Sequence, residues 1–225
     1  MNLSQNLDVT YFIPRRPGFA YPIADDFYLC GRWKNLTSLT LNNMRCTTEG
    51  LPNLAVFLSE HENLEILRFR STGAGTEALA LSYNTLPRLK ELESDREFAN
   101  AILSCNTDIS RPLETLKGID LSGSESDPAF FENLTRIGDK ISRVELASWG
   151  EMKDLHKLLE CVPRLTWLNI GNHGSSGRSE HGYGGVRTVS TVSYRVPRFQ
   201  GSKMTTRTVG HKCSSSSQTL KRSTV

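Results

Sequence analysis

The chain has 225 residues, of which 37% are hydrophobic and 23% are charged, and its formal net charge is +3. These values are ordinary for a globular chain. They exclude a membrane-spanning protein, because no apolar run approaches the roughly 20 residues that a membrane-spanning helix needs. The charge is uneven: residues 174–225 carry nine Lys or Arg and one Glu, a net +8, whereas residues 1–173 carry 18 basic and 23 acidic residues, a net −5.

Residues 1–32 show no helical or strand periodicity, and several prolines and glycines interrupt them. This pattern predicts a loop with short extended pieces. Aromatic residues are dense here, and we expect them to form a capping segment that covers the end of the folded region that follows. No apolar signal-peptide core is visible at the N-terminus.

The next 141 residues, 33–173, contain six segments in which aliphatic residues recur with the same spacing. The first positions of these segments are separated by 28, 25, 27, 25 and 24 residues, which is the period of leucine-rich repeats. The segments are Leu36-x-x-Leu39-x-Leu41, Leu64-x-x-Leu67-x-Phe69, Leu89-x-x-Leu92-x-Ser94, Leu116-x-x-Ile119-x-Leu121, Ile141-x-x-Val144-x-Leu146 and Leu165-x-x-Leu168-x-Ile170. Each segment predicts a short strand with alternate side chains directed inward.

Helix signals lie between these strands. Apolar residues with helical spacing predict helices over 51–58, 95–103, 127–137 and 151–161, and a short helical turn over 76–81. Because each connection runs strand–helix–strand, the strands must be parallel. We therefore expect an α/β fold over residues 33–173, a leucine-rich-repeat solenoid of about six strand–helix repeats with a curved parallel sheet.

The C-terminal segment, 174–225, is rich in Ser, Thr, Gly and Arg and poor in apolar residues. Such a composition cannot bury enough apolar surface to fold alone, so we expect this segment to be disordered. Its basic residues are scattered rather than clustered, which makes nucleic acid an unlikely partner.

Five cysteines are an odd number, and none forms a C-x-x-C pair; they are Cys30, Cys46, Cys105, Cys161 and Cys213. This usage predicts reduced thiols in a cytoplasmic or nuclear protein rather than a disulfide framework.

The outward positions of the predicted strands offer the candidate binding site. They would line the concave face of the solenoid, where such proteins commonly bind partners. Trp and Arg are also residue types that dominate interface energetics. The candidate partner-binding residues are Arg68, Arg70, Glu91, Glu93, Asp120, Arg143, Glu145, Trp167 and Asn169. The alternative is an ordinary solvated strand surface with weak ion pairs.

No catalytic or cofactor motif is present. The sequence has no H-E-x-x-H, G-x-S-x-G or Walker loop and no zinc-spaced set of Cys and His. His61 follows a predicted helix between two glutamates, which indicates a solvated turn. We therefore expect a protein that is not an enzyme and that holds no cofactor or metal.

The stretches around Leu36–Asn43, Leu64–Phe69 and Leu86–Leu92 resemble the ribonuclease-inhibitor-like class of leucine-rich repeats. The Leu-Pro-Arg-Leu lead into a strand, followed by Phe98–Leu103, is similar to the repeat region of fungal F-box proteins. That resemblance implies a protein–protein interaction module, the substrate-recognition part of an F-box-type ubiquitin ligase subunit.

In that family an F-box binds a Skp-type adaptor, but residues 1–32 lack the F-box pattern, so adaptor binding would require an F-box upstream. An alternative function from another class is a leucine-rich-repeat regulator, such as a GTPase-activating protein.

Overall fold

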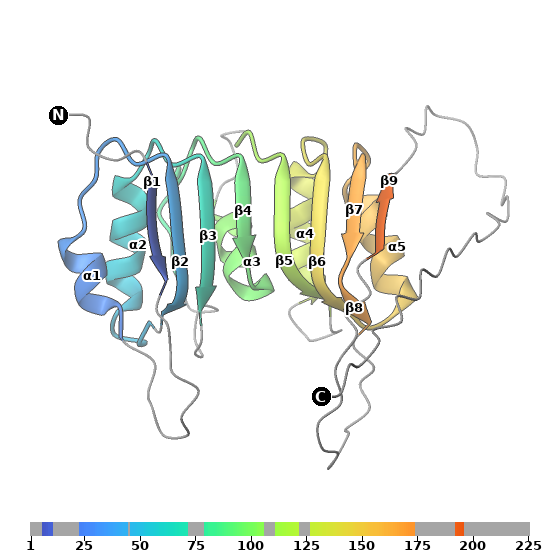
Figure 1. Cartoon of the computed structure of the whole chain (residues 1–225). Helices are drawn as coiled ribbons and strands as arrows, with labels where there is room; N and C mark the ends of the chain where they lie inside the picture. The colour runs from blue at the N-terminus through green and yellow to red at the C-terminus, as the bar shows by residue number, and fades with distance from the viewer. Residues whose placement is uncertain are drawn as a thin grey trace, which may run out of the picture.

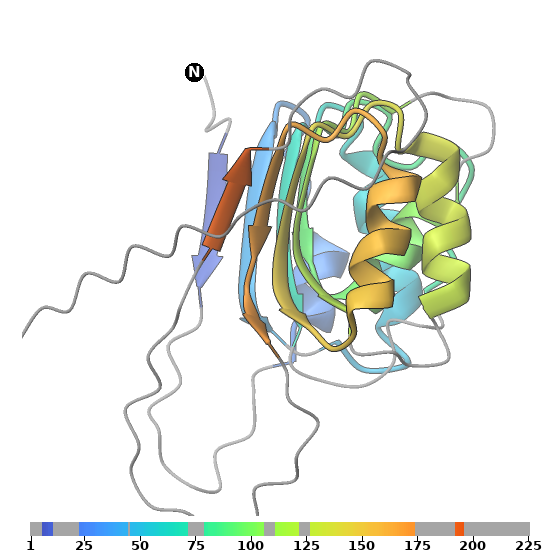
Figure 2. The same ribbon diagram turned by 90° about the vertical axis from the view of Figure 1, so that its right-hand side faces the viewer.

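The computed structural model describes residues 6–10, 23–44, 46–71, 79–105, 111–121, 127–173 and 192–195. These residues form one sheet, and helices α2 to α5 cover one of its faces (Figures 1 and 2). The strands are β1 (Asn6–Thr10), β2 (Ser38–Met44), β3 (Ile66–Ser71), β4 (Glu91–Ser94), β5 (Thr115–Leu121), β6 (Arg143–Trp149), β7 (Trp167–Ile170), β8 (Asn172–His173) and β9 (Val192–Arg195). The helices are α1 (Asp25–Cys30), α2 (Leu51–Glu60), α3 (Arg96–Ser104), α4 (Asp127–Ile137) and α5 (Met152–Cys161).

The strands follow one another across the sheet in chain order, from β1 to β7, and all of these neighbours are parallel. The short strand β8 pairs with β6, and β9 adds to β7 in the antiparallel direction. The predicted α/β fold with a parallel sheet alternating with helices is therefore confirmed.

The register of the sheet stacks equivalent aliphatic side chains. The same row of the sheet contains Leu39, Leu67, Leu92, Leu116, Val144 and Leu168, and all of them are buried. Three residues earlier in each segment lies a second set of buried residues: Leu36, Leu64, Leu89, Leu113, Ile141 and Leu165.

A repeated hydrogen-bond arrangement fixes the frame of each segment. The carbonyl oxygens of residues 37, 65, 90, 114 and 142 each accept two backbone N–H groups from the next segment, the last pair being those of Thr166 and Trp167. Equivalent positions are thus 28, 25, 24, 28 and 24 residues apart. The fourth segment therefore begins at Leu113. The sequence spacing placed its start at Leu116, three residues later, and that prediction is wrong.

Gly118 explains why the fourth segment is irregular. Its φ is +80°, a conformation that an L-residue rarely adopts, and the register between β5 and β6 shifts at this position. A Cβ on Gly118 would lie 2.9 Å from the backbone oxygen of Ser94 on the adjacent strand. After this bulge, Ile119 takes the buried position.

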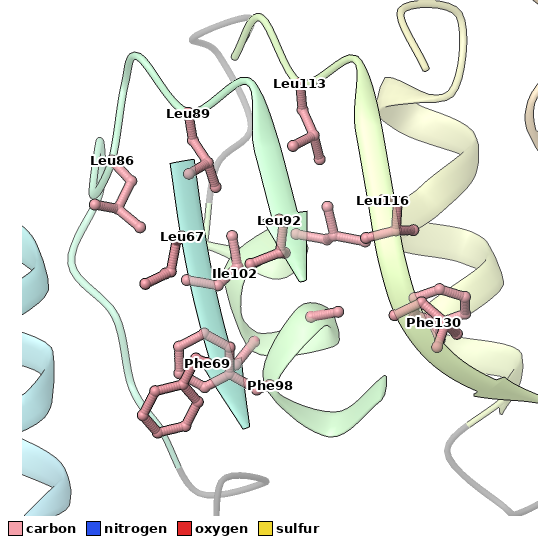
Figure 3. Close-up of a cluster of buried hydrophobic side chains, with 14 of the residues drawn as sticks. Leu67, Phe69, Leu86, Leu89, Leu92, Phe98, Ile102, Leu113, Leu116 and Phe130 are labelled. Atoms are coloured by element: carbon pink, nitrogen blue, oxygen red, sulfur yellow. The ribbon is translucent and has the colours of Figure 1, made fainter. Parts of the chain in front are cut away.

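The core lies between the sheet and the helix layer. Figure 3 shows its centre, where Phe69 of β3 stacks on Phe98 of α3 with ring centroids 4.3 Å apart. The surrounding leucines of β3, β4 and β5 point toward the helices. α4 has the bounds that the sequence predicted, and α2, α3 and α5 agree within two residues at each end. Removing each such buried side chain from water contributes roughly 1.5–3 kcal/mol.

The connection from β3 to β4 departs from this pattern. Residues 79–90 form turns and extended backbone, so the predicted helical turn is wrong at its described end, 79–81, and the rest of it lies outside the described residues. Asn84 and Leu86 have positive φ values of 66° and 56°. The buried Arg111 donates to Thr85 O (2.6 Å) and also to Ile102 O, which ties this connection to α3.

The connection also interrupts the helix layer. α1 packs on α2, α3 on α4 and α4 on α5, whereas α2 and α3 make no comparably extensive contact with each other. The sheet, in contrast, is continuous across the same point.

The described parts of the N-terminal segment, β1 and α1, lie at one end of the fold. β1 extends the sheet, with Leu7 and Val9 packed on the core. The helix α1, which the sequence did not predict, places Phe27 and Tyr28 against Phe57 of α2. Asp25 at its start accepts hydrogen bonds from both the backbone and the hydroxyl of Thr47.

The described cysteines are free thiols: Cys46 and Cys161 are buried, Cys105 is half-buried and Cys30 is exposed. Burial, together with the nearby Asp25 carboxylate, raises the pKa of Cys46 to about 12, so this thiol is unreactive at neutral pH. Within the described ranges, none of the helices has the length and apolar character needed to cross a bilayer.

Most of the segment 174–225, which we expected to be disordered, lies outside the described residues. Its residues 192–195 differ from that expectation, because they form β9 on the edge of β7.

Candidate functional site

The candidate site is the face of the sheet that points away from the helices, which we name the open face. Its residues alternate along each strand with the buried core residues. They are Ser38, Thr40 and Asn42 on β2, Ile66, Arg68 and Arg70 on β3, Glu91 and Glu93 on β4, Thr115 and Lys117 on β5, Arg143 and Glu145 on β6, and Trp167 and Asn169 on β7. No described helix covers this face (Figure 2).

An ion-pair lattice joins three strands of the open face; we define it as Arg68, Arg70, Glu91, Glu93 and Lys117. Arg68 Nη2 lies 2.9 Å from Glu91 Oε1, and its Nε lies 3.5 Å from Glu93 Oε2. Arg70 Nη2 pairs with Glu93 Oε1, and Lys117 Nζ lies 2.8 Å from Glu91 Oε1. Each carboxylate thus contacts two cations, and Arg68 connects the two halves.

Within the lattice, the carboxylates are less exposed to solvent than the arginines. The side chains of Glu91, Glu93 and Lys117 are 20%, 18% and 19% exposed, whereas those of Arg68 and Arg70 are 37% and 63% exposed. The N–H groups of Arg70 that do not contact Glu93 therefore face solvent, and a partner could use them.

The charge state of Glu91 reflects these contacts. Burial acts to raise its pKa, but the hydrogen bonds and positive charges of Lys117 and Arg68 outweigh burial, and the pKa is lowered. Glu91 is accordingly ionised at neutral pH and keeps both cations in place.

A second feature of the open face is a cation–π pair. The guanidinium carbon of Arg143 lies 3.9 Å from the ring centroid of Trp167 on the neighbouring strand. Within the part of the chain that the structure describes, Arg143 has no carboxylate partner. Its N–H edge is available to a bidentate carboxylate acceptor while its planar face stays on the indole.

The structure brings together most of the predicted site residues. Arg68, Arg70, Glu91 and Glu93 meet in the lattice, and Arg143, Glu145, Trp167 and Asn169 lie on β6 and β7 at the same face. Asp120 is exposed on β5, but after the bulge it is level with Ser148 and lies outside the lattice.

Lys117 is the site residue that the sequence reasoning missed. The frame beginning at Leu116 made Asp120 the outward residue of its strand, whereas the observed register pairs Lys117 with Glu93 on one side and Glu145 on the other. The signal that could have found it is the alternation of charge along this row: Arg68, Glu93, Lys117, Glu145.

His61 also differs from the sequence prediction of a solvated turn. It is only 2% exposed, its Nδ1 donates to Phe57 O at 2.6 Å, and its Nε2 accepts the backbone N–H of Trp33 at 3.2 Å. These bonds require the neutral imidazole with the proton on Nδ1. His61 is therefore a structural residue of the N-terminal end of the fold.

The helix layer carries a groove on its outer side. A shallow groove of about 390 Å³ between α4 and α5 has Phe131 and Cys161 at its floor and charged residues at its rim. Among the described residues, no cluster of three His, Cys, Asp or Glu side chains is arranged to hold a metal ion.

Comparison with known proteins gives no relative. No protein-family model, no curated protein and no solved structure matches this chain. The geometry of the open face is therefore the basis for inferring a function.

Proposed function

We propose that this chain is a leucine-rich-repeat solenoid of the ribonuclease-inhibitor-like class whose curved sheet binds a protein partner on the open face. The repeated acceptor position at residues 37, 65, 90, 114 and 142 supports the repeat architecture, because each segment satisfies the same backbone groups of the next.

The observation that carries the binding function is the ion-pair lattice on an uncovered sheet. Its side chains are held in fixed positions by mutual contacts, so a partner would lose less conformational entropy by binding them than by ordering free side chains. The guanidinium of Arg70 belongs to the most exposed side chain of the lattice, and its ion pair contributes little to stability, which favours a role of Arg70 in recognition.

Arg143 on Trp167 supplies the anchor expected of such an interface. Trp and Arg are the residue types in which interface energy concentrates. With Arg70, this pair gives two exposed guanidinium groups on the open face, each with N–H groups directed to solvent.

Affinity capture with charge-reversal variants tests this proposal. The variant Arg70→Glu/Arg143→Glu changes only the open face. The control Arg136→Glu/Lys153→Glu makes the same charge change on exposed positions of α4 and α5. We expect the control to retain a protein that cross-links to the wild-type chain, and the open-face variant to capture at least tenfold less of it. The two variants should have equal melting temperatures. Equal retention by both variants would contradict the proposal.

The resemblance to fungal F-box proteins suggests that the bound protein is a ubiquitination substrate. This finer function requires a Skp-type adaptor in the assembly. Co-purification of the chain with such an adaptor tests it, and a clean absence of the adaptor would leave the open face as a binding surface of another kind.

A further inference from the structure

The last strand of the sheet is unlike the others. β9 pairs with β7 in the antiparallel direction, with Trp167 opposite Arg195 and Ile170 opposite Val192, whereas all strands from β1 to β7 are parallel. Only four residues of each strand take part in this ladder.

Few contacts hold β9 in place. Among the described elements, β7 is the only one with which β9 makes extensive contact. The ladder between β7 and β9 is four residue pairs long, and so short a ladder offers only a small net stabilisation.

The contact also leaves one polar group unsatisfied. Asn169 Oδ1 is inaccessible to water and has no hydrogen-bond partner, and Asn169 is the residue opposite Ser193 of β9. A buried acceptor without a donor is destabilising. The residue opposite Ser193 thus carries an unpaired side-chain oxygen, which adds nothing to the stability of the β7–β9 pairing.

The backbone of β7 shows which groups β9 covers. The N–H groups of Trp167 and Gly171 bond to carbonyls of the β6 side, Ser142 O and Leu146 O. Because N–H groups alternate in direction along a strand, those of Leu168 and Ile170 point toward β9. Without β9 they would be an unpaired sheet edge, which is a template for another strand.

We propose that the edge of β7 is an acceptor site for an extended peptide in antiparallel orientation, and that β9 is the chain's own exchangeable occupant of this site. β9 occupies this site by the addition of a strand to the sheet edge, beside Trp167 and Asn169. This inference does not depend on the partner proposed above.

The test uses the full chain with Tyr194→Pro. Tyr194 lies opposite Leu168, whose N–H faces β9, so its own N–H belongs to the ladder and a proline at this position removes that hydrogen bond. The control is Ser216→Pro, in the same basic segment but outside β9. The probe is a fluorescent peptide of residues 190–197, and a second peptide with proline at position 194 is its control.

We expect the probe peptide to bind the Tyr194→Pro chain at least tenfold more tightly than the wild-type or Ser216→Pro chain, and the proline peptide to bind none of them. In the same variant, amide hydrogen exchange at Leu168 and Ile170 should rise at least tenfold, while that of Asn169 stays unchanged. A probe that binds all three chains alike or none of them, or unchanged exchange at Leu168 and Ile170, would overturn the proposal.

Discussion

The substitution Lys117→Met tests whether the ion-pair lattice is an ordered, partly buried structure. Lys117 Nζ lies 2.8 Å from Glu91 Oε1, and the two side chains are 19% and 20% exposed. Hydrogen bonds to charged groups contribute roughly 1.5–3 kcal/mol, and exposed ion pairs roughly 0.2–1 kcal/mol. Because Arg68 remains beside Glu91 after the substitution, we expect a loss between these ranges, about 1 kcal/mol at pH 7.

A double-mutant cycle isolates the pair. Lys117→Met, Glu91→Gln and the double variant should show a coupling free energy of about 1 kcal/mol at pH 7. The pKa of Glu91 is lowered in the folded state. Its contribution is therefore fully present above the unfolded pKa of about 4.3, decreases as the pH falls below that value, and is lost once Glu91 is protonated in the folded state.

Urea unfolding of the four chains at pH 7, and at intervals down to pH 3, measures this coupling. Lys153→Met is the control, because Lys153 and its partner Glu151 are both largely exposed, and its unfolding midpoint should match that of the wild-type chain. Additive effects of the two substitutions at pH 7, or a coupling that persists undiminished in acid, would refute the reasoning.

Three further predictions concern stability. Gly118→Ala places a Cβ against a backbone oxygen at a positive φ, so we expect a loss of about 2–3 kcal/mol in urea unfolding; a loss below 0.5 kcal/mol would exclude the tight bulge. His61→Leu leaves the carbonyl of Phe57 and one backbone N–H unpaired, and should lower stability by about 2–3 kcal/mol, measured by thermal melting; an unchanged melting temperature would contradict this. Arg111→Met releases the carbonyl of Thr85, so amide exchange should rise in residues 79–90 but not in α5; a uniform rise would show a global effect instead.

The sequence predicted strands β2 to β7 and helices α2 to α5 because burial dictates their spacing. A short strand must put the same aliphatic positions on the core side in each segment, and the leucine rows follow from that requirement. The bounds of α4 were predictable because its proline suits the first turn of a helix and its apolar residues have helical spacing.

The frame of the fourth segment could not be read from hydrophobicity alone. Leu113, Leu116 and Ile119 are all buried, so two frames three residues apart fit the same spacing. The hydrogen bonds to neighbouring strands and the bulge at Gly118 decide between them. Both depend on residues far away in the sequence, and Lys117 was missed for this reason.

His61 shows the same limit. Its neighbours in the chain are glutamates, which favour an exposed position, yet it is buried by contacts with Phe57 and Trp33. Trp33 is 28 positions away, so local sequence gives no sign of this packing.

The interruption between α2 and α3 has a mechanical consequence. In the described residues, the helix layer consists of two blocks, one containing α1 and α2 and the other containing α3 to α5. The β3–β4 ladder, the ion-pair lattice and the stacked rings of Phe69 and Phe98 join the two blocks. Bending of the sheet would therefore concentrate at this seam, because helix packing stiffens the sheet on both sides of it but not across it.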